Sequence, residues 1–118
     1  MAVARLKRRP EFLAVAASGL KLATPAMIVQ ARRRGDDEAP RLGLTASRKV
    51  GGAVERNRAR RRLRAAAEAV IPLAGRTGHD YVLVARTAAL TRPYALLVED
   101  LTRALGRLAS PSRRPEDR

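Results

Sequence analysis

The sequence predicts an α+β fold in which helices cover a small mixed sheet. Residues 26–33 and 41–47 have strand patterns, and residues 80–86 are apolar on both faces, as is typical of a central strand. Helical patterns occupy residues 54–70 and the segment that follows Pro93. Because each element must bury its apolar side against another layer, the order helix, two or three strands, helix, strand, helix predicts a two-layer sandwich.

The chain begins with a predicted short helix over residues 5–19. Pro10 lies near its start, where the missing N–H leaves no bond unmade. Phe12 and Val15 follow at helical spacing, and Gly19 is a stop signal.

The next segment predicts a β-hairpin. Residues 34–40, "RGDDEAP", have turn chemistry throughout and connect the strands 26–33 and 41–47. The second strand alternates, so one of its sides carries Leu42, Leu44 and Ala46. Gly51-Gly52 ends this region, with room for a short third strand just before it.

The last predicted helix is amphipathic and is capped by Thr91 or Arg92. Its apolar positions are Tyr94, Leu97, Leu101, Leu105 and Leu108. Residues 110–118 are polar and contain prolines, so we predict a disordered tail there and one domain over residues 1–109.

The high positive charge of the chain indicates a polyanionic partner. Twenty-five Lys and Arg residues oppose 11 Asp and Glu residues, a formal charge of +14 in 118 residues. Nucleic acid is the first candidate and an anionic membrane surface the second. No apolar run reaches the roughly 18 residues of a membrane span, and the absence of cysteine fits a reducing compartment. We therefore expect a cytoplasmic protein that does not act at a membrane.

Residues 55–64, "ERNRARRRLR", concentrate this charge on one helix. At about 100° per residue, one side of the helix is apolar and another is cationic. The predicted apolar stripe consists of Ala59, Leu63, Ala66 and Val70. The cationic face consists of Arg56, Asn57, Arg60, Arg61 and Arg64, with Arg58 and Arg62 to one side. Like charges four residues apart repel each other, and phosphate groups would relieve that repulsion. A solvated basic surface is the simpler alternative, and the pattern does not separate RNA from DNA.

The segment "RLGLTASRKVGGAVERNRARRRLRAA", residues 41–66, resembles the signature of the bacterial ribonuclease P protein component. The matching pieces are Ser47-Arg48-Lys49, Val50-Gly51, Ala53-Val54, Arg56-Asn57-Arg58, Arg60-Arg61 and Arg64. "RLKRRPEFLAVAASG", "HDYVLVARTAA" and the final leucine-spaced helix extend the resemblance to residues 5–109.

The resemblance implies an α-β-β-β-α-β-α order with a left-handed βαβ crossover and one RNA-binding domain. It implies the protein subunit of ribonuclease P, a ribozyme-based endoribonuclease that removes the 5′ leader from precursor tRNA. A catalytic RNA subunit would be the partner and would hold the catalytic Mg²⁺ ions, with no obligate protein partner and no tightly bound cofactor on the protein alone. The implied RNA contacts are Arg48, Lys49, Arg56, Asn57, Arg58, Arg60, Arg61 and Arg64. The implied leader groove is formed by Phe12, Ala16, Gln30, Arg48 and Lys49. Since Ala16 and Gln30 stand where the family often has aromatics, leader binding is expected to depend more on phosphate contacts and on hydrogen bonds from Gln30.

The sequence shows no pair of histidines and no cluster of distant carboxylates of the kind that a protein nuclease needs. The chain has one histidine, His79, and its acidic cluster at residues 36–38 lies in a predicted turn. We therefore predict no catalytic residue and no metal ligand in the protein itself. The alternative function is that of a structural ribosomal protein or a basic DNA-binding protein with no catalytic role.

Overall fold

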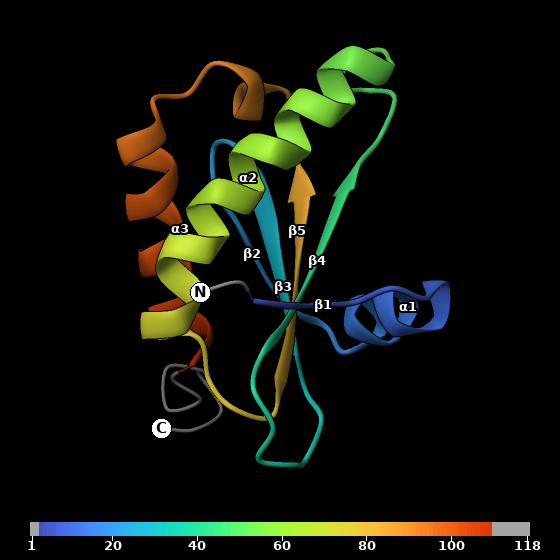
Figure 1. The fold of residues 1–118 in the computed structure, drawn as a ribbon, viewed down its shortest axis with the longest axis vertical. Coiled ribbons are helices and arrows are strands. Elements are labelled where there is room, and N and C mark those ends of the chain that lie inside the picture. Colours follow the sequence, from blue (N-terminus) through green and yellow to red (C-terminus); the bar gives the residue numbers. More distant parts are fainter. Residues whose placement is uncertain (1–2, 110–118) are drawn as a thin grey trace.

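The computed structural model describes residues 3–109, so the predicted tail at residues 110–118 lies outside the described residues. A five-stranded sheet with the strand order β1-β4-β5-β3-β2 carries three α-helices (Figure 1). The elements are β1 (Ala4–Arg5), α1 (Arg9–Ala17), β2 (Leu20–Ala23), β3 (Met27–Arg33), β4 (Arg41–Ala46), α2 (Ala53–Ala74), β5 (His79–Ala85), a 3₁₀ turn η1 (Thr87–Leu90) and α3 (Tyr94–Leu108). The α+β class and the predicted order of helices and strands are confirmed, with β1 as an addition at the sheet edge.

Strand β5 occupies the centre of the sheet, as its continuous apolar sequence predicts. It pairs with β3 in antiparallel and with β4 in parallel orientation. The predicted hairpin between β3 and β4 is therefore wrong, because β5 lies between them. The loop 34–40 instead crosses the start of β5, where Arg34 N–H donates to Gly78 O at 2.6 Å and Gly78 N–H donates to Glu38 O at 2.7 Å.

Helix α2 connects the parallel strands β4 and β5. In Figure 1 the chain rises along β4, descends through α2 in front of the sheet and enters β5 to the left of β4. This path is a left-handed βαβ crossover, the rare hand for such connections. The expectation drawn from the family resemblance is thus confirmed.

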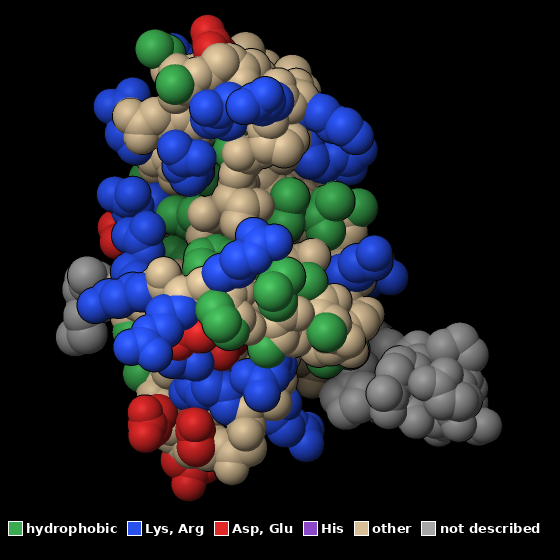
Figure 2. Space-filling model, turned by 90° about the vertical axis from the view of Figure 1, so that its right-hand side faces the viewer, with side chains coloured by type: hydrophobic (Ala, Val, Ile, Leu, Met, Phe, Trp, Pro, Cys, Tyr) green, Lys and Arg blue, Asp and Glu red, His purple; other side chains and the backbone are tan. Residues whose placement is uncertain are grey.

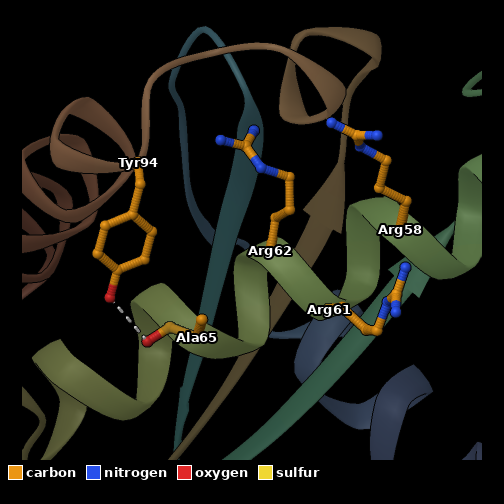
Figure 3. Close-up of a pocket in the computed structure, with 5 residues that line it drawn as sticks. All are labelled: Arg58, Arg61, Arg62, Ala65 and Tyr94. Carbon is orange, nitrogen blue, oxygen red and sulfur yellow. Dashed lines mark hydrogen bonds between the residues drawn. The ribbon is translucent and has the colours of Figure 1, made fainter.

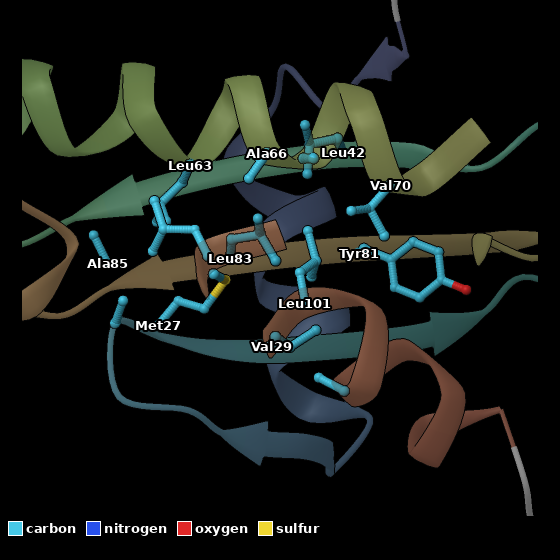
Figure 4. Packing of buried hydrophobic residues seen from close by; sticks show 14 of the residues in the cluster. Met27, Val29, Leu42, Leu63, Ala66, Val70, Tyr81, Leu83, Ala85 and Leu101 are labelled. Carbon is cyan, nitrogen blue, oxygen red and sulfur yellow. The ribbon is translucent and has the colours of Figure 1, made fainter. Parts of the chain in front are cut away.

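Helices α2 and α3 cover one face of the sheet and enclose the main core. Leu63, Ala66 and Val70 of α2 and Leu101 of α3 point toward the sheet (Figure 4). The sheet contributes Met27 and Val29 of β3, Leu42 of β4, and Tyr81, Leu83 and Ala85 of β5. Leu42, Leu44 and Ala46 share this side of β4, as the alternation predicts.

Helix α1 packs on the opposite face, whereas the predicted two-layer sandwich would place all helices on one face. Val15 is fully buried there and forms a second, small cluster with Leu6 and Val82. The predicted helix 5–19 is also too long, because Ala4 and Arg5 pair with Arg41 and Leu42 as a short edge strand. Burial of Val3 and Leu6 keeps this segment extended, and Pro10 stands at the start of the helix as predicted.

Three other boundaries differ from the predictions. The third strand between α1 and α2 is β2, and residues 48–50 before Gly51 form a turn. Helix α2 runs past Pro72 to Ala74 because Ile71 is buried and its carbonyl accepts from Gly75 N–H at 2.8 Å. The N-cap of α3 is Pro93, and neither Thr91 nor Arg92 as predicted.

Candidate nucleic-acid interface

Helix α2 buries one side, and between Arg56 and Arg64 it presents arginine on its other sides. The predicted apolar stripe is confirmed, since Ala59, Leu63, Ala66 and Val70 are all buried. Asn57, Arg58 and Arg61 are exposed, and Arg56, Arg60 and Arg64 are half-buried. We call these six residues the α2 cationic surface.

The two flanks of this surface differ in their neighbours. Arg62 bonds to the carbonyls of Ala89 and Arg92 at 2.7 Å each, so the Arg58 and Arg62 flank faces η1 and the start of α3. Arg56, Arg60 and Arg64 recur every four residues on the flank away from α3. The 100° rotation therefore predicted which arginines lie together.

The α2 arginines lack acidic partners within residues 3–109. Every ion pair of those residues involves arginines of other segments. Arg56 reaches the carbonyl of Gly51 at 3.2 Å, and the Nε of Arg64 is buried with no hydrogen-bond partner. A dense row of unpaired guanidinium groups repels itself and favours binding of an external anion.

Arg48 and Lys49 lie in the turn between β4 and α2. Val50 N–H donates to Ser47 O at 3.0 Å and Gly51 N–H donates to Arg48 O at 3.1 Å, which closes the turn. Val50 is buried, whereas Arg48 and Lys49 are exposed. The turn thus holds two cations next to the N-terminus of α2.

Phe12 of α1 lies against β4. A Cβ atom at Gly43 would be 2.5 Å from Cε2 of the ring, so only glycine leaves room for this contact. Phe12 is therefore half-buried. Ala16 is exposed on α1, and Gln30 is half-buried on β3, on the sheet face that carries α1.

The sheet positions beside these residues were missed by the sequence analysis. Ile28 and Thr45 both pair with Val84, which places the three half-buried side chains in one row on the α1 side of the sheet. We call this row, together with Gln30, the open sheet face. Figure 2 looks at this side of the molecule and shows hydrophobic side chains between groups of Lys and Arg side chains. The alternation of residues along β3 could have predicted that Ile28 lies on this face. The row itself could not be predicted, because it depends on which strands are neighbours in the sheet.

A buried ion network holds α1 on the sheet. Asp80 is fully buried and accepts from Arg34 at 2.6 Å and from Arg41 at 2.8 and 2.9 Å. Arg41 also donates to Glu11 of α1 at 3.2 Å. Burial raises the pKa of Asp80, but the hydrogen bonds from Arg41 and Arg34 outweigh burial and hold that pKa below its usual value. Backbone N–H groups of Arg8 and Lys7 likewise lower the pKa of Glu11.

The remaining titratable candidates are held by local contacts. His79 approaches Thr77 O at 2.9 Å through Nδ1 and stacks on Tyr81 with 6.0 Å between ring centroids. Asp36 pairs with Arg34 at 3.0 Å. No group of three His, Cys, Asp or Glu residues in the described part of the chain could hold a metal ion. Among the same residues, the helices are all too short or too polar to cross a membrane.

Comparisons with known proteins agree with this architecture. A family model described as Ribonuclease P matches residues 2–109. The ribonuclease P protein component of Caulobacter vibrioides is 50% identical over 107 residues, which cover 90% of this chain and 71% of that protein. The corresponding protein of Paramagnetospirillum magneticum is 48% identical over 110 residues, covering 90% and 83%. The solved structure of the ribonuclease P protein from Thermotoga maritima matches with a TM-score of 0.74 at 28% identity, covering 87% of this chain and 96% of that one. The chain belongs to the ribonuclease P protein family.

Proposed function

We propose that this chain is the protein subunit of the ribonuclease P ribonucleoprotein, which removes the 5′ leader from precursor tRNA. The observation that carries the proposal is the α2 cationic surface, whose arginines have no acidic partner within residues 3–109. Its members, Arg56, Asn57, Arg58, Arg60, Arg61 and Arg64, would contact the catalytic RNA subunit. Arginine matches phosphate oxygens with two parallel hydrogen bonds, which suits a structured RNA backbone.

The single-stranded leader of the substrate would bind across the open sheet face. Phe12 supplies an aromatic ring against Gly43 of β4, and Arg48 and Lys49 supply cations in the turn that follows the end of β4 at Ala46. Gln30 on β3 offers an amide group, and the exposed Ala16 on α1 offers a small apolar contact. Because Phe12 is half-buried against Gly43, phosphate contacts would supply much of the leader affinity.

The chemistry of cleavage would belong to the RNA. We assign the catalytic Mg²⁺ ions mainly to the RNA subunit, with the protein lowering the repulsion between two RNA backbones and thereby strengthening the binding of Mg²⁺ and substrate. The proposal places residues 1–109 in one RNA-binding domain that works in the cytoplasm, with no membrane and no obligate protein partner. A structural ribosomal or DNA-binding role is not favoured, because the relatives are ribonuclease P protein components.

Reconstitution tests the proposal directly. The full chain is mixed with the catalytic RNA subunit of its own organism, and cleavage of a precursor tRNA is followed at low Mg²⁺ concentration. We expect cleavage at the mature 5′ end only when both components are present. Cleavage by the protein without the RNA, or cleavage by the RNA that is unchanged when the protein is added, would contradict the proposal.

A further inference from the structure

A hollow of about 410 Å³ lies between α2 and the start of α3, on the flank of α2 opposite to Arg56, Arg60 and Arg64. It is lined by Arg58, Arg61, Arg62, Ala65 and Tyr94. Figure 3 shows Arg58 and Arg62 pointing from α2 toward the segment before α3, with Tyr94 reaching back to α2. The hollow is wide open to solvent, so a segment of an extended partner could enter it.

The walls of the hollow are held in place by hydrogen bonds within the protein. The Tyr94 hydroxyl donates to Ala65 O at 3.3 Å, a long hydrogen bond that connects the ring to α2. Arg62 donates to Ala89 O and Arg92 O at 2.7 Å each, which ties η1 and the start of α3 to α2. The site therefore needs little rearrangement before a ligand binds.

The exposed groups of the hollow match one nucleotide. The Tyr94 side chain is 45% exposed, so part of an aromatic ring is available for a base. Arg58 and Arg61 are exposed and form no ion pair or hydrogen bond within residues 3–109. Arg61 stands four residues before Ala65, about 6 Å along the helix axis. Because the Tyr94 hydroxyl reaches Ala65, the ring approaches the turn of α2 next to that of Arg61, and both side chains line a hollow that would hold a base and its phosphate.

We propose that this hollow binds an unpaired nucleotide of the catalytic RNA, with the base against Tyr94 and the phosphate against Arg58 and Arg61. The inference rests on the proposed function and adds to it a stacking site on the α3 side of α2. An RNA partner is favoured over an acidic peptide because the ring and the guanidinium groups lie together on the arginine-rich part of α2, residues 56–64.

Two substitutions at position 94 separate stacking from the tyrosine hydroxyl. Tyr94→Leu keeps apolar bulk but removes the flat ring, and Tyr94→Phe keeps the ring but removes the bond to Ala65. The affinity of each full-length variant for the catalytic RNA is measured across a range of salt concentrations. We expect Tyr94→Leu to weaken binding roughly 5- to 100-fold and Tyr94→Phe to bind much as the wild type does. Neither variant loses a charge, so neither should change the slope of log affinity against log salt concentration. Arg58→Ala removes a charge and should lower that slope.

Chemical probing of the RNA adds a second readout. One unpaired base should become reactive in the complex with Tyr94→Leu and stay protected with Tyr94→Phe. Leu73→Ala, which removes an 89% exposed side chain further along α2, is the matched control and should change neither measurement.

Several results would overturn the inference. Wild-type affinity of Tyr94→Leu would exclude a nucleotide at this site and would fit a peptide or no ligand. Equal weakening by Tyr94→Leu and Tyr94→Phe would mean that the hydroxyl bond, and not the ring, matters. These results count against the hollow alone when the wild type reconstitutes cleavage and Arg60→Ala with Arg61→Ala weakens RNA binding. If that double variant binds RNA as the wild type does, the proposed function and this inference fail together.

Discussion

Two groups of arginines in this chain have opposite environments. Arg34, just after β3, and Arg41, in β4, bond to the buried carboxylate of Asp80, and the side chain of Arg34 is only 9% exposed. Arg60 and Arg61, on α2, have no acidic partner within residues 3–109. The first group closes an internal network that positions α1, and the second leaves its charge for an external anion.

The difference shows that the count of arginines does not reveal what each arginine does. Where a neighbouring strand provides a carboxylate, the arginine forms an ion pair that stabilises the fold. Removal of either partner then leaves the other charge buried and unpaired. Where no acid is supplied, the same side chain destabilises the helix slightly and serves binding. Substitutions in the two groups should therefore affect different measurements.

The largest effect is expected at Asp80. Asp80→Asn leaves Arg34 and Arg41 without their carboxylate, and loss of one partner from a buried pair costs about 3–5 kcal/mol. Chemical denaturation should show this loss in the free energy of unfolding. Asp37→Asn, the same chemical change on an exposed loop residue, is the control and should unfold at the wild-type denaturant concentration.

Acid should reproduce part of this effect in the wild type. Because the folded-state pKa of Asp80 is lowered, its contribution to stability is complete above the unfolded value of about 3.9 and is lost as the pH falls through the lower folded value. The fall in thermal stability below about pH 4 should be smaller in Asp80→Asn. An unchanged acid dependence in that variant would show that Asp80 does not stabilise the fold in this way.

A smaller loss of stability is expected from a substitution at Gly43, which changes packing without changing charge. In Gly43→Ala the new methyl group would stand 2.5 Å from Phe12 and 3.1 Å from Leu6, so the ring must move. Such overpacking costs about 1–3 kcal/mol. Gly106→Ala, in α3, adds a methyl group that meets open space and should instead stabilise the protein in the same denaturation assay.

The contribution of the ring itself is measured with Phe12→Leu, which preserves apolar volume. If a leader base stacks on Phe12, binding of a precursor with a leader should weaken by up to about 1–3 kcal/mol, while binding of leaderless tRNA should not change. Leu13→Ala, at an exposed neighbouring position, is the control. Equal losses for both RNAs would exclude a leader-specific role of Phe12.

The smallest effect has the opposite sign. Arg60→Ala removes repulsion from Arg56 and Arg64, each four residues away, and places a better helix former on α2. The free energy of unfolding should rise by a few tenths of a kcal/mol. A clear loss of stability would mean that Arg60 belongs to the fold, as Arg41 does.

The sequence predicted the elements whose pattern is strong and local. Rotation along residues 54–70 separated Leu63 from Arg60 on α2, and the doubly apolar run at residues 80–86 predicted the central strand. The sequence-based predictions failed where residues distant in the sequence determine the structure. The loop 34–40 has hairpin chemistry, yet β5 enters between the two strands, and the two residues of β1 are too few to form a pattern.

The residues of the candidate site also fall into two groups, those that one helix predicts and those that depend on the tertiary structure. The α2 cationic surface follows from one helix, so its residues could be predicted in advance. The row of Ile28, Thr45 and Val84 needs three strands in register, and Tyr94 reaches the hollow only because α3 packs beside α2. No role was predicted for Asp80, although one carboxylate inside an apolar strand is itself a signal of buried ion pairing.

The salt dependence of RNA binding tests the central claim most directly. Arg60→Ala with Arg61→Ala removes two positive charges from α2, and Arg33→Ala with Arg107→Ala removes two exposed charges elsewhere, so both variants carry the same net charge. The slope of log affinity against log salt for the catalytic RNA should fall by roughly 1.4–1.8 in the first variant and hardly change in the second. Equal slopes in the two variants would contradict the account, because net charge and not the α2 cationic surface would then determine RNA binding.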